Sequence, residues 1–382
     1  MSQKKRLSRA ARRRRQRNKR IALFVIGLIV VGVVWLGILM FLNRNEKDAG
    51  ERQPITAEKE EEGQKEPSAE VTPTETPTPT PEPLPTVDMS GLYSKSAILT
   101  RLSDGQVVAE MDADQQLYPA SMTKMMTAIV AIENLSDMEQ MITLPQEIFD
   151  PLYAEGASMA GFAPGDQVRA VDLLYGVVLP SGAECCIGLA NQIAGSESAF
   201  VDMMNAKAQE LGMTATHFVT STGLHDPEHY TTVRDLTKLL AYALENETFR
   251  TIFTTKSYTT SPVASAPEGL SFSSSMFDKM ESPAVNGGEI EGGKTGYTSD
   301  AGLCLASLAV VNGTEYICVT AGADGNTWTE PYHVYDAQNI YNQIDPSGQE
   351  SDSADTGTDD AAASDAPAAD GAGTAEASGD AE

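Results

Sequence analysis

The chain has 382 residues and a formal net charge of −27, but the charge is distributed very unevenly. Lys4–Arg20 is rich in basic residues and contains no acid, whereas Asp345–Glu382 contains acids and no base. This asymmetry excludes one uniform globular chain, and it leaves a single domain's worth of ordinary sequence, residues 88–344, between segments of biased composition.

A long uncharged apolar stretch, Ile21–Leu42, follows the basic head of residues 1–20. A helix of this length covers about 30 Å, which is the hydrocarbon thickness of a bilayer. A signal peptide would have a shorter apolar core and a small-residue cleavage site, and the flanking sequence NRNEKDAG offers no good site. We therefore predict one uncleaved transmembrane helix over residues 21–42, with the head in the cytoplasm and the rest of the chain outside. Beside a membrane span, nucleic-acid binding is the weaker interpretation of the Arg-rich head, and we expect no nucleic-acid partner.

Two further segments have a composition that cannot form a packed core. Residues 43–87 are rich in Glu, Thr and Pro and end in TPTETPTPTPEPLPT, which predicts an extended, semi-stiff linker. The acidic tail of residues 345–382 is of low complexity, and we expect it to be disordered. A folded domain is therefore predicted for residues 88–344.

The predicted domain begins and ends with strands and is mainly helical between them. SAILTR and QVVAEM, joined through LSDG, predict a β-hairpin at its start. Helical patterns dominate over Ser121–Asn134 and Val171–Glu245. Near the end, two apolar stretches flank Asn312-Gly313, the strongest short signal for a hairpin turn. We predict an α+β fold, in which an antiparallel sheet takes strands from both ends of the domain and lies beside a helical lobe.

Ser121 and Lys124 lie in YPASMTKMMTA, a segment whose other residues favour a buried helix. Residues three apart share one face of a helix, about one turn apart. A lysine that faces a core has a large desolvation cost unless it is paired or used. A Ser-x-x-Lys match occurs by chance roughly once or twice in a chain of this length, so alone it assigns no function.

Two more short motifs follow along the chain. LPSGAE places Ser181 at the end of an apolar stretch, before a further predicted helix. GGKTGYTSDAG places Lys294-Thr295-Gly296 just ahead of the last hairpin, where a strand edge can present backbone groups to a ligand. Ser-x-x-Lys on a helix, a Ser-x-x loop and Lys-Thr-Gly on a strand, in this order, are the signature of penicillin-recognising serine enzymes.

Over roughly Ser96–Ile344 the chain resembles the serine-type D-alanyl-D-alanine carboxypeptidases, the low-molecular-mass penicillin-binding proteins. PASMTKMMTA is similar to the nucleophile segment of that family, PGDQVRAVDLLYGVVLPSGAE to its second motif and GGKTGYTSDAG to its third. MNAKAQELGMTATHF and STGLHDPEHYTTVRDL also resemble family segments outside the active centre. The resemblance implies a β-lactamase/transpeptidase-like fold, a bacterial source, and no cofactor or metal.

The resemblance also implies how a peptide bond between two D-alanines would be cleaved. Ser121 would attack the carbonyl and form an acyl-enzyme, which water then hydrolyses. A serine hydroxyl is a poor nucleophile until a base takes its proton, and Lys124 would be that base. Ser181 would relay a proton to the leaving amine.

Substrate binding is implied for the third motif. Lys294 and Thr295 would bind the terminal carboxylate of the substrate, and Gly296 completes the motif. The backbone N–H groups of Ser121 and Tyr297 would form the oxyanion hole.

Two positions depart from the family pattern. The second motif usually ends in Asn, whose amide contacts the substrate, and here that position is Ala183. Aligning HVYDA with the family's region before its last helix puts His333 where an Arg often helps to hold the substrate carboxylate. Either change can slow the enzyme or alter its substrate, but neither removes the nucleophile or the base.

We expect the four cysteines to be free, mostly buried thiols. If Asn312-Gly313 forms a two-residue turn, Cys318 lies opposite Ser307 and Cys304 lies opposite Ala321. Cys304 and Cys318 then point to opposite faces of the sheet and cannot bond to each other. The neighbours Cys185-Cys186 diverge on a helix. Disulfides are permitted outside the cell, but this pattern does not require one.

The remaining charged and histidine residues receive structural interpretations. His225 and His229 have a spacing that can bind zinc on a helix, but Asp226-Pro227 lies between them and no third ligand is evident. Lys207, Lys238 and the acidic residues of the helices are expected on solvated faces.

The leading prediction is a membrane-anchored carboxypeptidase that acts on peptidoglycan stem peptides and is inhibited covalently by β-lactams. Two other functions remain as alternatives. A β-lactamase needs an acid that activates the deacylating water, usually in a Glu-x-x-x-Asn loop, and Glu197 and Asn205 do not have that spacing. A catalytically weakened wall-binding or penicillin-binding module is favoured by Ala183, but intact Ser121 and Lys124 argue against it. The expected location is the bacterial plasma membrane, with the catalytic domain outside the cytoplasm.

Overall fold

The computed structural model describes residues 84–349. The predicted head, the transmembrane helix at 21–42, and most of the linker and acidic tail lie outside these residues, so their structure stays a prediction. Within 84–349, no helix is long and apolar enough to cross a membrane.

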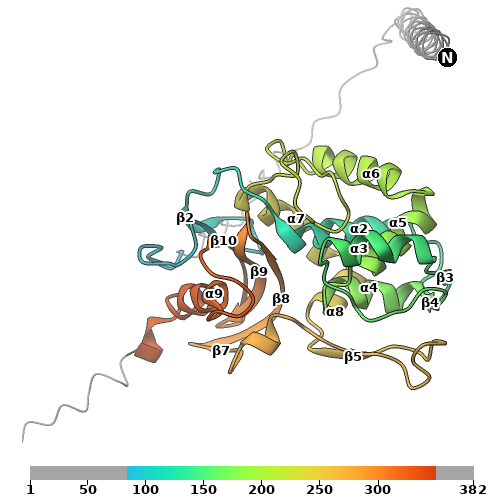
Figure 1. Cartoon of the computed structure of the whole chain (residues 1–382). Coiled ribbons are helices and arrows are strands. Elements are labelled where there is room, and N and C mark those ends of the chain that lie inside the picture. Colours follow the sequence, from blue (N-terminus) through green and yellow to red (C-terminus); the bar gives the residue numbers. More distant parts are fainter. Residues whose placement is uncertain (1–83, 350–382) are drawn as a thin grey trace, which may run out of the picture. The chain divides into compact units, whose positions relative to one another are not determined.

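A six-stranded sheet forms one half of the domain (Figure 1). Every neighbouring pair of its strands is antiparallel. The strands, in spatial order, are β2 (Val107–Met111), β1 (Ser96–Arg101), β10 (Thr314–Ala323), β9 (Gly302–Val311), β8 (Gly288–Thr298) and β7 (Ala284–Val285). Strands from the start and the end of the domain are therefore paired side by side, which confirms the predicted α+β architecture and the predicted hairpin β1–β2.

The turn between β9 and β10 has the predicted two-residue form. Asn312 and Gly313 both have positive φ angles, 51° and 76°, as a type I′ turn requires. Cys318 lies opposite Ser307, as predicted. The register shifts between Thr320 and Ala323, so Cys304, predicted to lie opposite Ala321, faces an irregular stretch of β10 without a one-to-one partner there.

The other half of the domain is the helical lobe. Its helices are α2 (Thr123–Asn134), α3 (Phe149–Ala154), α4 (Ala170–Val178), α5 (Ala183–Ala194), α6 (Glu197–Glu210), α7 (Val233–Glu245) and α8 (Glu247–Phe253). Two small hairpins accompany them, β3 (Met141–Thr143) with β4 (Gln167–Arg169), and β5 (Ser257–Thr259) with β6 (Ser271–Ser273). The predicted helical region is interrupted between α6 and α7, where residues 211–232 are non-helical.

Two hydrophobic cores lie on the two faces of the sheet. The larger is shared between the helical lobe and one face, and α2 runs through it with ten consecutive buried residues, Thr123–Ile132. The smaller lies between the other face and α9 (Tyr332–Asn342) (Figure 1). Cys304 belongs to the first core and Cys318 to the second, which confirms that they face opposite sides. All four cysteines are free and buried, as predicted.

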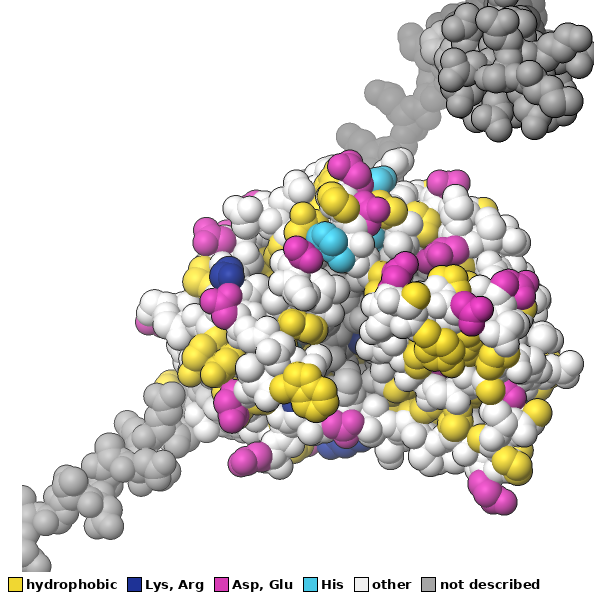
Figure 2. Space-filling model, in the orientation of Figure 1, with side chains coloured by type: hydrophobic (Ala, Val, Ile, Leu, Met, Phe, Trp, Pro, Cys, Tyr) yellow, Lys and Arg dark blue, Asp and Glu magenta, His cyan; other side chains and the backbone are white. Residues whose placement is uncertain are grey.

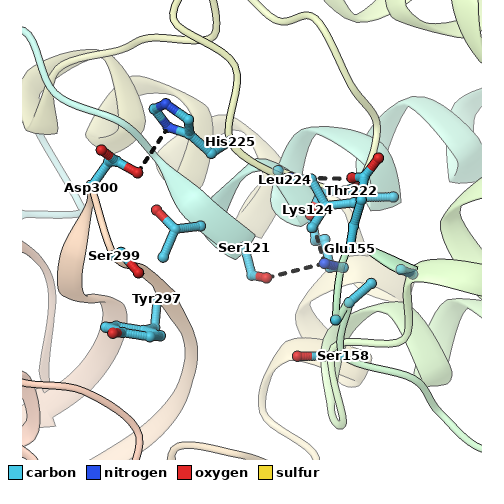
Figure 3. A pocket seen from close by; sticks show the side chains of 15 residues that line it. Ser121, Lys124, Glu155, Ser158, Thr222, Leu224, His225, Tyr297, Ser299 and Asp300 are labelled. Carbon is cyan, nitrogen blue, oxygen red and sulfur yellow. Dashed lines mark hydrogen bonds and ion pairs between the residues drawn. The ribbon is translucent and has the colours of Figure 1, made fainter. Parts of the chain in front are cut away.

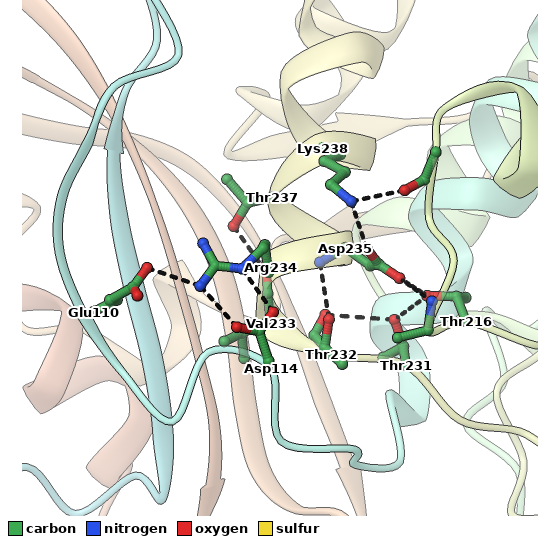
Figure 4. Close-up of polar contacts among 12 residues, drawn as sticks. Glu110, Asp114, Thr216, Thr231, Thr232, Val233, Arg234, Asp235, Thr237 and Lys238 are labelled. Atoms are coloured by element: carbon green, nitrogen blue, oxygen red, sulfur yellow. Dashed lines mark hydrogen bonds and ion pairs between the residues drawn. The ribbon is translucent and has the colours of Figure 1, made fainter.

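Several charged helical residues are not on solvated faces, and for these the sequence prediction is wrong. Asp235 on α7 is buried because it accepts hydrogen bonds from Thr216 Oγ1 and the Ala215 N–H and pairs with Lys238 (Figure 4). These contacts fasten the non-helical segment 211–232 to the helix. Lys207 is mostly covered, with a side chain 13% exposed, and it pairs with Glu210 one turn along α6 and with Glu133 on α2.

Candidate active site

The first turn of the central helix carries Ser121 and Lys124. A 3-10 helix, Ala120–Met122, runs directly into α2, and Ala120 has a positive φ of 47°, which an L-residue rarely adopts. Lys124 Nζ lies 3.0 Å from Ser121 Oγ (Figure 3). The predicted sharing of one helix face is therefore confirmed, and the strained residue beside the serine is typical of a functional segment.

Lys124 lies in an environment that favours the neutral amine. Its side chain is buried, and burial lowers its pKa from the ordinary lysine value. Lys124 Nζ donates to the Thr222 carbonyl oxygen at 2.6 Å. Once neutral, the amine keeps this contact through N–H and can turn its lone pair toward the Ser121 hydroxyl.

Ser181 and Lys294 form a second serine–lysine contact. Ser181 sits between α4 and α5 with φ 69°, and its Oγ lies 3.0 Å from Lys294 Nζ. Lys294 is on β8, as predicted, and also donates to the Thr295 carbonyl oxygen at 2.9 Å. Burial, and then the neighbouring Lys124, lower the pKa of Lys294 well below its ordinary value.

Strand β8 passes directly beside Ser121 because Gly296 has no side chain. A Cβ at Gly296 would lie 3.1 Å from the Pro119 carbonyl oxygen and 3.2 Å from Ser121 N. The backbones of Gly296 and Ser121 therefore run against each other, which places the Tyr297 peptide next to the serine. This is the arrangement expected of a shared oxyanion hole.

A cleft of two connected compartments surrounds Ser121, and Figure 2 shows a hollow on this face of the domain. The first compartment, about 560 Å³, is lined by Lys124, Ala183 and the Thr222–His225 segment. The second, about 340 Å³, is lined by Ser181 and Thr295. Ser121, Gly156, Ser158 and Tyr297 line both. The structure thus gathers all the predicted site residues around one serine, with Lys294 just behind Ser181.

Glu184 contributes to the cleft but was not predicted from the sequence. It is buried next to Ala183, and its Oε1 accepts the N–H groups of Ala160 and Gly161 at 2.7 and 2.9 Å. The Ala183 N–H donates to the Ser158 carbonyl oxygen. The start of α5 therefore holds the wall of the first compartment, and burial raises the pKa of Glu184. No local pattern marks Glu184, because its partners are far away in the sequence.

His333 lines the second compartment, at the start of α9. It is 1% exposed, and its Nδ1 has no hydrogen-bond partner within residues 84–349. Burial, and then Lys279, lower its pKa to about 3, so the imidazole is neutral near pH 7. Lys279, which also lines this compartment, was not predicted from the sequence.

The histidines of the zinc alternative have other contacts. His229 Nε2 lies 2.8 Å from Thr123 Oγ1, and its Nδ1 accepts the Val219 N–H. The segment between His225 and His229 is not helical. In the part of the chain that the structure describes, no group of three or more His, Cys, Asp or Glu side chains could hold a metal ion.

Glu197 and Asn205, weighed for the β-lactamase alternative, support the segment that leads to Thr222. Glu197 Oε1 accepts the N–H and the hydroxyl of Ser221 at 2.9 and 2.8 Å. Asn205 exchanges two hydrogen bonds with the Phe218 backbone. Neither of them lines the two compartments.

Residues 84–325 match the D-alanyl-D-alanine carboxypeptidase family. The chain is 33% identical over 253 residues to the D-alanyl-D-alanine carboxypeptidase DacC of Escherichia coli, with 62% of this chain and 58% of that protein covered. It is 30% identical over 230 residues to DacF of Bacillus subtilis, with 60% and 57% covered. The chain thus spans less than three fifths of the length of these curated relatives.

Two solved structures share the fold. The Streptomyces K15 DD-transpeptidase superposes with a TM-score of 0.60 at 26% identity, covering 68% of this chain and 99% of that one. A D-alanyl-D-alanine carboxypeptidase from Mycobacterium tuberculosis superposes with a TM-score of 0.58 at 25% identity, covering 69% and 95%. The architecture of helical lobe and antiparallel sheet is therefore the transpeptidase-like one.

Proposed function

Because the chain belongs to the D-alanyl-D-alanine carboxypeptidase family, we propose that it removes the terminal D-alanine from peptidoglycan stem peptides through an acyl-enzyme on Ser121. The observation that carries the proposal is the 3.0 Å contact between Ser121 Oγ and a buried Lys124 Nζ, at the junction of two cleft compartments. A nucleophile and its base must lie within hydrogen-bond reach of each other, and these two do.

The acylation step uses the neutral form of Lys124. The amine takes the proton of the Ser121 hydroxyl while Oγ forms a bond to the carbonyl carbon between the two D-alanines. Negative charge develops on the carbonyl oxygen, where the backbone N–H groups of Ser121 and Tyr297 stabilise it. A general base of this kind contributes about 10²–10⁴ in rate.

Collapse of the tetrahedral intermediate breaks the peptide bond. The leaving amine of D-alanine must gain a proton, and the hydroxyl of Ser181 relays to it the proton that Lys124 took from Ser121, so Lys124 is neutral again for the next step. Ser181 Oγ is held in place by Lys294 Nζ at 3.0 Å. Water then attacks the ester carbonyl of Ser121, with Lys124 again as base, and releases the shortened peptide. β-Lactams acylate Ser121 by the same first step and are covalent inhibitors.

We further propose that the domain works outside the cytoplasm of a bacterium, held at the plasma membrane. The proposal is supported by the uncharged stretch Ile21–Leu42, the basic head before it and the Pro-rich linker after it. A linker of about forty residues in an extended form can hold the domain well away from the bilayer, among the glycan strands. Protease added to protoplasts should remove the domain and spare the basic head, whereas protection of the domain would contradict this topology.

A weakened penicillin-binding module is the second candidate, and Ala183 is the observation that favours it. Ala183 lines the first compartment, where a methyl group can neither donate nor accept a hydrogen bond. Such a module would still be acylated by penicillin but would not turn over peptide.

Incubation of the full-length protein with a peptide that ends in D-Ala-D-Ala tests the proposal. We expect release of free D-alanine, and no release by Ser121→Ala. Penicillin labelling without D-alanine release would favour the weakened module, and rapid hydrolysis of penicillin would favour a β-lactamase. Absence of both labelling and release would contradict a serine acyl-enzyme altogether.

A further inference from the structure

The second compartment has an electrostatic character unlike the rest of the domain. Acidic residues far outnumber basic ones within residues 84–349. Among the residues that line the second compartment, however, no Asp or Glu occurs, and the ionisable side chains are Lys279, His333 and Tyr297. The hydroxyls of Ser275 and Thr295, 2.6 Å apart, add neutral hydrogen-bonding groups. This chemistry fits a small anion.

Lys279 is an unpaired cation in a domain where most cations are paired. Lys95, Arg169, Arg234 and others form ion pairs with carboxylates. Within residues 84–349, Lys279 has no carboxylate within ion-pair distance, although it is partly buried at the end of the 3-10 helix Phe277–Lys279. A partly buried, unpaired ammonium loses solvation without compensation, so this site has a free positive charge to offer a ligand.

The neighbours of Lys279 cannot supply this charge themselves. His333 is neutral near pH 7, and its buried Nδ1 is left without a partner. Lys294 is fully buried, is committed to Ser181 Oγ and the Thr295 carbonyl, and has a pKa well below its ordinary value. Lys279 is therefore the positive charge of this compartment at neutral pH.

We propose that Lys279 is a specificity-determining residue that pairs with the terminal carboxylate of the substrate, while Ser275, Thr295 and the imidazole of His333 complete its hydrogen bonds. This inference rests on the proposed function, because it requires that a peptide with a free C-terminus reacts at Ser121. It places the departing D-alanine in the second compartment and the acyl part of the peptide in the first. It also moves the charge that recognises the carboxylate from the Lys-Thr-Gly motif to a lysine outside any motif.

Acylation by two forms of one β-lactam tests the inference. Penicillin and its methyl ester open the same strained ring, but only the first carries a carboxylate. Mass spectrometry of the intact full-length protein gives the rate of acylation by each. Lys279→Met should slow acylation by penicillin about tenfold or more, because a charge-assisted hydrogen bond is lost, and should leave acylation by the ester within about twofold.

Lys256 offers a control from the same region, since among the described residues it also has no ion pair and its ammonium lies over the Phe277 ring, but it is exposed. Lys256→Met removes the same charge from the same neighbourhood and should change neither rate. Lys279→Arg, which keeps the charge, should restore most of the selectivity for the acid.

An equal loss with both ligands in Lys279→Met, no loss with either, or the same selective loss in Lys256→Met would each overturn the inference while leaving Ser121 as the nucleophile. Failure of the unmodified protein to be acylated by either ligand would overturn the proposed function, and this inference with it.

Discussion

At the scale of single residues, the proposed chemistry depends on keeping Lys124 uncharged next to a hydroxyl. Burial lowers its pKa, and the nearby Glu184 carboxyl acts in the opposite direction. The Thr222 carbonyl satisfies one N–H without adding a full negative charge. A carboxylate in place of that carbonyl would hold the lysine protonated and would remove the base.

Ala183→Asn tests the position at which the chain departs from the family pattern. Asn would place an amide in the first compartment, where it can meet a substrate amide that otherwise finds only water. One such contact in a partly desolvated site stabilises by about 1–3 kcal/mol, so acylation by penicillin or peptide should be roughly 5- to 150-fold faster. A slower rate in a folded variant would mean that the site around Ala183 has been repacked for another substrate.

Glu184→Gln tests whether the buried carboxyl influences the base. Gln can still accept both N–H groups of Ala160 and Gly161, so the cleft wall should keep its place. Loss of the carboxylate should lower the pKa of Lys124 further, since that carboxyl raises it. The acid limb of the pH–rate profile for acylation should therefore move to lower pH, and an unchanged profile would contradict this role. Glu184→Ala, which frees both N–H groups, should instead lower the rate at every pH.

At the scale of elements, the close approach of three segments builds the site. Gly223, on the segment before α7, has φ 76°, and a Cβ there would lie 1.9 Å from the carbonyl oxygen of Ala120, the residue before Ser121. Gly296 also allows a close approach from β8, although a less extreme one. Small movements of either backbone would therefore displace Ser121 relative to Lys124.

Gly223→Ala should be both destabilising and inactivating. Gly212→Ala is the matched control, because Gly212 also has a positive φ, 65°, but a Cβ there would meet nothing within 4 Å. Gly212→Ala should lower the free energy of unfolding by about 1 kcal/mol, because of backbone strain alone. Gly223→Ala should cost clearly more in urea unfolding and should slow acylation at least about tenfold. Equal effects of the two substitutions would mean that the contact with Ala120 is unimportant.

Local sequence patterns could predict the elements that have a clear helical periodicity or a typical turn sequence. Ser121 and Lys124 were placed together by helical spacing, and Asn312-Gly313 by its turn chemistry. The supporting residues could not be predicted in this way. Thr222 binds Lys124 through a backbone carbonyl, Glu184 contacts a segment distant in the chain, and Lys279 lines a compartment formed by distant segments. The roles of these residues depend on tertiary packing, which sequence periodicity does not indicate.

At the scale of the whole molecule, buried histidines link stability to pH. Burial lowers the pKa of His229 to about 4, whereas an unfolded histidine has its ordinary value near 6.5. The unfolded chain therefore binds more protons between these values, and stability is lost as the pH falls from about 6.5 toward 4. His229→Gln should reduce the loss of unfolding free energy between pH 7 and pH 4.5 by about 2–3 kcal/mol.

The exposed His217 provides the control for this pH effect. His217→Gln should lose as much stability on acidification as the unmodified protein, when both are measured by urea unfolding at the two pH values. A His229→Gln variant with the same pH dependence as the unmodified protein would show that His229 is protonated in the folded state.

Locating the acyl group tests directly whether Ser121 is the nucleophile. The full-length protein is treated with penicillin and digested, and the adduct is located by mass spectrometry, with Ser121→Ala treated in parallel. We predict one adduct, on the peptide that contains Ser121, and none in the variant. An adduct on another peptide, or labelling that survives the substitution, would contradict it.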